Sequence, residues 1–164
     1  MKKSLILLIL LMLTSSFVET WVTTQISSSV SVQLPNKVEK QIIDGIEVYK
    51  AANSNCKFSV TLKQLPDSIE TQRNFEIYFL KGLVAGTVIA SNGELLAEKT
   101  FKIGASEGIE ISYTAPSEKS LVNHKRVFVV EKTLYTLDCR DLKENDKDCF
   151  KDRRKFFDSI KLKK

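Results

Sequence analysis

Apolar and polar positions alternate along much of this chain, which predicts extended segments that bury one side. Val30, Val32 and Leu34 fall on one side of a strand that ends at Pro35 and Asn36. Six further segments are predicted as strands: residues 45–52, 56–65, 95–103, 108–115, 120–130 and 133–139. The turns between them are expected at residues 53–55, 104–108 and 131–132.

A different period predicts a long helix after residue 66. Asp67 lies three positions before Glu70, which allows a capping box, and Asn92-Gly93 is a typical helix stop. The apolar positions at helical spacing are Phe75, Phe79, Leu83 and Val84. Gly82 and Gly86 lie one turn apart within this helix, where each costs about 1 kcal/mol relative to alanine. We expect them to form a flat face that lets the helix lie close to a sheet.

The last segment, residues 145–162, is predicted as an amphipathic helix in which Cys149, Phe156 and Ile160 recur at helical spacing. The predicted order is three strands, a helix, four strands and a helix. Short connections between consecutive strands favour an antiparallel sheet, and each amphipathic helix needs sheet surface to cover. The chain is therefore predicted to be α+β, with an antiparallel sheet of about six to seven strands and two covering helices in one domain, residues 21–164.

The N-terminal segment has the three-part pattern of a secretory signal peptide. Lys2 and Lys3 precede an apolar run of nine residues, Leu5–Leu13, and small polar residues follow. We assign residues 1–20 to the signal, with cleavage after Ser16 or after Thr20. The run is shorter than the ~20 residues of a membrane span, and no later stretch is long and apolar enough. The expected product is secreted or periplasmic, with no integral membrane segment after signal removal.

Charge excludes one class of partner. The formal net charge is +5, and removal of Lys2 and Lys3 lowers it to +3, or to +4 if Glu19 is also removed. Basic and acidic residues are mixed along the chain, apart from a basic end. We interpret that end as a solvated helix face rather than an anionic-surface site. Nucleic-acid binding, which needs a basic stripe, is not expected.

Four local patterns resemble the PsbP/Mog1-like family. They are a first strand ending in proline (Val30–Pro35), a hairpin with two spaced glycines (Phe101–Tyr113), a late hairpin (Arg126–Leu137) and a closing helix (Phe156–Leu162). The resemblance implies an α/β/α sandwich around an antiparallel sheet. It also implies a mostly non-catalytic role, since members of that family serve as extrinsic photosystem subunits, nucleotide-exchange accessories and exported proteins of unknown role. The family has no shared catalytic motif to carry over, and fold alone does not give function.

Catalytic and metal motifs are sparse. The single histidine, His124, would have to serve any Ser-His or Cys-His scheme, and no G-x-S-x-G motif accompanies it. Cys139 and Cys149 lack the close ligand spacing of a zinc site. The acids between Asp141 and Asp148 lack the glycine of an EF-hand loop. No P-loop or dinucleotide fingerprint is present. We therefore predict no catalytic residue, no metal site and no cofactor.

The three cysteines allow three single disulfides: 56–139, 56–149 and 139–149. An exported chain meets an oxidising space in which paired thiols become disulfides. The pairing of Cys139 with Cys149 closes the shortest loop and joins neighbouring elements of the expected fold, so we predict that bond and leave Cys56 free.

These observations favour an exported, non-catalytic PsbP/Mog1-like α+β domain. Such a domain would bind, or act as an accessory to, another macromolecule, with an unknown protein or a small apolar ligand as its partner. The alternative is a small secreted hydrolase that uses His124.

Overall fold

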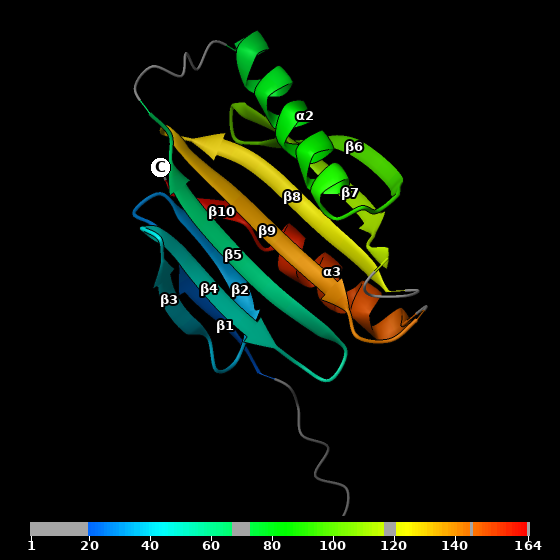
Figure 1. The fold of residues 1–164 in the computed structure, drawn as a ribbon. Coiled ribbons are helices and arrows are strands. Elements are labelled where there is room, and N and C mark those ends of the chain that lie inside the picture. Colours follow the sequence, from blue (N-terminus) through cyan, green and yellow to red (C-terminus); the bar gives the residue numbers. More distant parts are fainter. Residues whose placement is uncertain (1–19, 67–72, 117–120, 145, 164) are drawn as a thin grey trace, which may run out of the picture.

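A central seven-stranded antiparallel sheet dominates the computed structural model, which describes residues 20–66, 73–116, 121–144 and 146–163. The strand order is β3-β4-β5-β9-β8-β7-β6 (Figure 1). The strands are β3 (Glu39–Ile43), β4 (Ile46–Ala52), β5 (Cys56–Gln64), β6 (Leu95–Ile103), β7 (Ser106–Thr114), β8 (Val122–Val130) and β9 (Thr133–Asp141). A smaller sheet has the order β1-β2-β10, formed by β1 (Trp21–Gln25), β2 (Val30–Pro35) and β10 (Lys161–Leu162).

The described helices, α2 (Arg73–Ala90) and α3 (Lys147–Asp158), lie on opposite faces of the central sheet (Figure 1). The α3 face is also covered by the small sheet, and its core includes Phe58, Leu137 and Phe156. The α2 face has a separate core around Leu80 and Ile111. Because side chains alternate along each strand, β8 and β9 contribute to both cores. The predicted α+β sandwich with two covering helices is confirmed.

α2 packs on β7 and β8 through Leu80 and Val84, which are 0% and 2% exposed. The expectation for Gly82 and Gly86 was wrong, because a Cβ atom added at either position would meet nothing within 4 Å. Both glycines lie on the exposed side of the helix.

The two predicted ends of α2 have different outcomes. Its capping box at Asp67 and Glu70 lies outside the described residues. Its predicted stop is confirmed, since Asn92 has a φ of 50° and the Gly93 amide donates to the Val88 carbonyl over 3.1 Å.

α3 is capped at its start by Asp146, whose carboxylate accepts from the amides of Asp148 and Cys149. It buries Cys149, Phe156 and Phe157 against the sheet. Just beyond the helix, the Ser159 hydroxyl accepts from the Gln33 amide over 2.7 Å and links the helix end to β2.

The strands from β4 to β9, and β2, match the predicted segments. β1, β3 and β10 were not predicted. Every residue of β3 is exposed, so no alternation marks it. The turn after β3 carried the missed signal: Asp44 and Gly45 have φ values of 51° and 77°, and Asp-Gly is a strong two-residue hairpin sequence. The predicted turn at Glu131 and Lys132 is confirmed, with φ values of 49° and 60°.

β6 and β3 form the two edges of the central sheet. Among the described strands, β6 pairs with β7 alone, and its first six residues are all exposed. A register shift between Leu95 and Ala97 interrupts its pairing. Among the described residues, no helix has the length and apolar character needed to cross a membrane.

Candidate functional site

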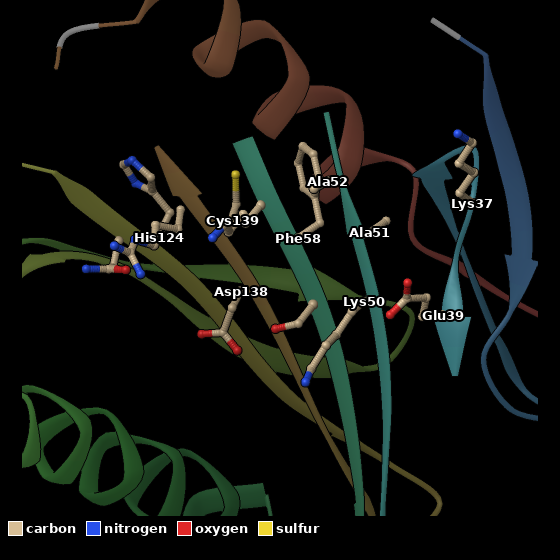
Figure 2. Close-up of a pocket in the computed structure, with 13 residues that line it drawn as sticks. Lys37, Glu39, Lys50, Ala51, Ala52, Phe58, His124, Asp138 and Cys139 are labelled. Carbon is tan, nitrogen blue, oxygen red and sulfur yellow. The ribbon is translucent and has the colours of Figure 1, made fainter. Parts of the chain in front are cut away.

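The half of the α2 face that α2 does not pack against presents polar side chains. Residues paired across neighbouring strands share a face, and here the pairs join β4, β5, β9 and β8. We call this surface the open sheet face and define it by Lys50, Ala52, Lys57, Ser59, Asn123, Lys125, Asp138 and Arg140. Figure 2 shows Lys50 and Asp138 on the opposite side of the strands from His124, Cys139 and Phe58.

The change from covered to open occurs within single strands. Along β8, Val127 is buried under α2, whereas Lys125, two residues earlier on the same face, is only partly buried. Along β9, Leu134 is buried while Asp138 is partly exposed. α2 therefore covers only the end of the sheet where these strands carry apolar residues.

The open sheet face is basic. It carries four cationic side chains, Lys50, Lys57, Lys125 and Arg140, and one acidic side chain, Asp138. Lys125 pairs with Asp138 over 2.8 Å. Lys50 donates to the Gln41 amide oxygen over 3.2 Å. The remaining positive charge lies above a floor of small side chains.

A groove of about 560 Å³ follows this face. Its floor includes Ala52 and Ser59, and Glu39 and Lys37 contribute at the β3 edge. Small floor residues leave room for a ligand chain to approach the sheet, and the cationic rim favours a negatively charged one.

A second polar cluster lies on the α3 face around His124, which is 7% exposed. Its Nδ1 atom lies 2.7 Å from the Ser112 hydroxyl, and its Nε2 atom lies 3.6 Å from an Asp141 carboxylate oxygen. The guanidinium of Arg153, from α3, also contacts Nε2. The fold thus brings a serine, a histidine and an aspartate together from β7, β8 and β9.

The protonation pattern of His124 argues against a catalytic triad. An arginine side chain can only donate hydrogen bonds, so Nε2 accepts from Arg153. A neutral imidazole then carries its proton on Nδ1 and donates it to the Ser112 hydroxyl oxygen. In this tautomer His124 has no lone pair with which to remove a proton from Ser112.

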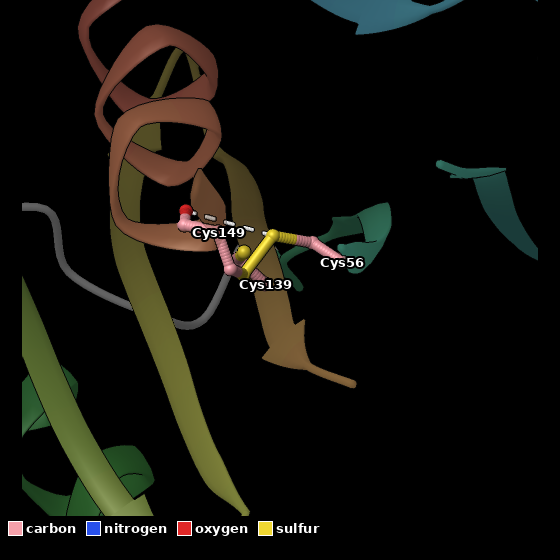
Figure 3. Close-up of side chains that lie close together, drawn as sticks. All are labelled: Cys56, Cys139 and Cys149. Carbon is pink, nitrogen blue, oxygen red and sulfur yellow. Dashed lines mark hydrogen bonds between the residues drawn. A yellow bond between two sulfur atoms is a disulfide. The ribbon is translucent and has the colours of Figure 1, made fainter. Parts of the chain in front are cut away.

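The cysteines pair differently from the prediction. Cys56 and Cys149 form the disulfide, with Cα atoms 5.6 Å apart, and Cys139 is the free, buried cysteine (Figure 3). The predicted Cys139–Cys149 bond was therefore wrong. The physical reason is that β5 lies beside β9, which places Cys56 opposite Asp141 and beneath the first turn of α3.

All three sulfur atoms lie within 4.8 Å of one another. Burial, followed by the negative charge of Asp141, raises the pKa of the Cys139 thiol far above its usual value. Cys139 is therefore protonated and poorly nucleophilic in the folded chain.

Arg126 connects the sheet to the end of α3. Its guanidinium contacts Glu110 over 2.6 Å and donates to the Phe157 carbonyl over 2.7 Å. Burial alone would raise the Glu110 pKa, but Arg126 and Lys99 outweigh it, so the Glu110 pKa lies below its usual value. This contact is structural, since it fixes the helix end against β8.

Sequence reasoning singled out His124, Cys139 and Cys149, and the structure brings all three to one end of the α3 face. It missed the open sheet face. Lys57 and Ser59 alternate with buried residues in β5, but which strands lie beside β5 cannot be read from that alternation alone.

Known proteins resemble this chain in structure rather than in sequence. No protein-family model and no curated protein sequence matches it. The solution structure of cyanobacterial PsbP (CyanoP) from Synechocystis sp. PCC 6803 is 14% identical, covers 91% of this chain and 96% of its own, and has a TM-score of 0.58. The crystal structure of the Saccharomyces cerevisiae Ran-binding protein Mog1p is 11% identical, covers 88% of this chain and 96% of its own, and has a TM-score of 0.51. The chain has a PsbP/Mog1-like fold.

Proposed function

We propose that the chain is an exported, non-catalytic accessory domain that binds an acidic surface of a partner protein through the open sheet face. The observation that carries this proposal is the polar half of the α2 face, which no described segment covers, with its cationic rim and its floor of small side chains. Antiparallel sheets commonly present one polar face to water, but this face carries four cationic side chains and one acidic side chain. One of the two similar structures is described as a Ran-binding protein, which is consistent with a binding role for this fold.

The chemistry of the groove favours a protein partner over a small apolar ligand. Ligand pockets for small apolar molecules are concave and mostly apolar. The groove is also lined by three cationic side chains, Lys50, Lys57 and Arg140, whose charges a purely apolar ligand would not match. Attraction between opposite charges would speed association and select acidic partners.

Export is part of the same proposal, with residues 1–20 as the signal region, cut after Ser16 or Thr20, and residues 21–164 as the folded domain. The Cys56–Cys149 disulfide suits an oxidising compartment, either outside the cell or in the periplasm. The Asn36 amide donates to the Thr20 carbonyl over 2.9 Å, next to the start of β1. A cut after Ser16 leaves Thr20 in the mature chain, where its carbonyl can accept this hydrogen bond. We therefore expect Phe17 to be the mature N-terminus. N-terminal sequencing of the exported product tests this choice against Trp21.

The binding proposal is tested with charge reversals. The mature chain is used to capture its partner from the compartment to which it is exported, and the affinity of the purified pair is then measured. We expect the Lys50→Glu, Lys57→Glu double variant to bind about tenfold more weakly, or about 1.4 kcal/mol. The matched control, Lys81→Glu with Lys102→Glu, makes the same charge change on exposed residues of α2 and β6. Equal affinities for the two double variants would contradict the proposed surface.

The alternative, a small secreted hydrolase using His124, draws support from the contacts of His124 with Ser112 and Asp141. The tautomer imposed by Arg153 argues against it. Activity screening of the mature chain against ester and peptide substrates decides between the two. Turnover that is abolished by both His124→Ala and Ser112→Ala, in folded variants, would favour the hydrolase and remove the non-catalytic assignment.

A further inference from the structure

Three sulfur atoms from three separate elements meet at one buried point. Cys56 begins β5, Cys139 lies near the end of β9, and Cys149 lies in the first turn of α3. All three residues are buried, at 0%, 1% and 0% exposure. Their sulfur atoms lie within 4.8 Å of one another. In a tetrahedral zinc site with Zn–S bonds of about 2.3 Å, two thiolates are about 3.8 Å apart. After reduction the Cys56 and Cys149 sulfurs would therefore have to separate, while the Cys139 sulfur already lies close to both.

A carboxylate lies beside one sulfur of this cluster. An Asp141 oxygen lies 3.0 Å from the Cys149 sulfur, and Asp141 is 9% exposed. A disulfide sulfur has no proton to donate, so in the oxidised chain this contact places a carboxylate oxygen against a sulfur that cannot donate a hydrogen bond to it. A cation between the two atoms, or a proton on a reduced Cys149, would satisfy the carboxylate.

We propose that the reduced chain binds one zinc ion through Cys56, Cys139, Cys149 and Asp141, and that the Cys56–Cys149 disulfide is the oxidised state of the same site. Three thiolates and one carboxylate complete a tetrahedral set of ligands that zinc accepts. The two states exclude each other, because the disulfide uses two of the three sulfurs.

The redox step is a thiol–disulfide exchange. A dithiol reductant supplies two electrons and two protons to the Cys56–Cys149 bond and itself becomes a disulfide. Zinc binding then displaces the protons of the three thiols. In the reverse direction a protein disulfide oxidises Cys56 and Cys149 and becomes a dithiol by accepting their two electrons and two protons from solvent; zinc leaves, and Cys139 takes up a proton from solvent.

The surroundings offset part of the charge. Three thiolates and a carboxylate on a divalent cation leave a surplus of two negative charges. The Arg153 guanidinium contacts His124, whose Nε2 atom lies 3.6 Å from Asp141, so a permanent positive charge stands beside the proposed ligand set.

The test uses Co²⁺ as a spectroscopic probe and Zn²⁺ in competition with a chromophoric chelator, on the full mature chain kept reduced under anaerobic conditions. We expect one Co²⁺ per chain, with the intense sulfur-to-cobalt charge-transfer absorption of thiolate ligands. Cys139→Ala should weaken Zn²⁺ binding by more than about tenfold. The oxidised wild-type chain should show no charge-transfer band, although it keeps every surface carboxylate and His124.

Two comparisons distinguish a specific zinc site in the folded chain from nonspecific metal binding by cysteines. Cys139→Ala retains the disulfide pair, so its oxidised form should melt close to the wild-type temperature, which shows that the substitution does not prevent folding. Asp141→Asn should also weaken Zn²⁺ binding, which an unfolded three-cysteine chain would not require. Equal Zn²⁺ affinity of the reduced wild type and Cys139→Ala, or of the wild type and Asp141→Asn, would overturn the site.

Discussion

α2 and α3 cover opposite faces of one sheet, and different interactions hold them there. α2 depends on an apolar strip, with Leu80 and Val84 against β7 and β8. α3 is shorter and more polar. It also buries Phe156 and Phe157, but it is held in addition by the Cys56–Cys149 disulfide and by Arg126, which contacts the end of the helix. A helix held by an apolar strip needs only the part of the sheet that matches the strip. This difference explains why α2 leaves the open sheet face uncovered.

The largest effect should come from the apolar strip. Leu80→Ala is expected to destabilise the chain by about 2–5 kcal/mol, because it leaves a cavity under α2. Chemical denaturation measures the change. The control on the same helix is Tyr78→Ala, which removes a side chain that is 71% exposed and should change stability by no more than about 0.5 kcal/mol. Similar losses in both variants would mean that α2 is not held by this strip.

The covalent anchor of α3 comes next. Replacing both Cys56 and Cys149 by serine should cost about 2–4 kcal/mol, since the bond constrains a loop with a sequence separation of 93. Cys139→Ala keeps the disulfide and should cost about 1 kcal/mol or less. Peptide mapping of the oxidised chain should find Cys56 joined to Cys149. A bridge that includes Cys139 would contradict the described anchor.

The polar contact at the end of α3, in which Glu110 pairs with Arg126, should depend on pH. The Glu110 pKa is lowered in the folded chain, so its contribution to stability is complete above the unfolded value near 4.5 and is lost as the pH falls through the lower folded value. Glu110→Gln should lower the free energy of unfolding by about 1.5–2 kcal/mol at neutral pH and should reduce the loss of stability between pH 7 and pH 3. Denaturation midpoints from pH 7 to pH 3 measure both. If stability falls equally at low pH in Glu110→Gln, the pH dependence comes from other carboxylates.

The smallest expected effect is a gain in stability rather than a loss. Gly86 lies on the exposed side of α2, and an added Cβ would meet nothing within 4 Å. Gly86→Ala should therefore stabilise the chain by about 0.8–1.0 kcal/mol through helix propensity. Thermal melts of this variant against Gly82→Ala, at the equivalent position one turn earlier, should give similar gains. A loss of stability would restore the close approach of helix and sheet that the glycines first suggested.

The sequence predicted the secondary-structure elements better than it predicted which elements lie side by side. Alternation along β5 and β9 is a local pattern, and both strands were found. Their pairing, which places Cys56 opposite Asp141, joins segments far apart in the chain and has no local signal. The wrong disulfide prediction follows from this, because the shortest loop was preferred without knowledge of strand order.

The helix faces show the same limit. Several apolar residues of α2 recur at helical spacing, so more than one face could be assigned to the core. The structure selects the face of Leu80 and Val84 because Ile109 and Ile111 lie opposite. The glycines were then placed on the wrong side. The open sheet face was missed for a related reason, since its basic residues come from strands whose order the sequence does not reveal.

The exposed edge strand β6 has a consequence for self-association. An unpaired edge of nine residues offers backbone groups to which a strand from another copy could add, as in aggregation. Charged residues and the pairing irregularity near Ala97 oppose that addition, and Lys99 and Lys102 lie along the strand. We therefore expect that loss of these lysine charges would favour the addition of a second copy at this edge.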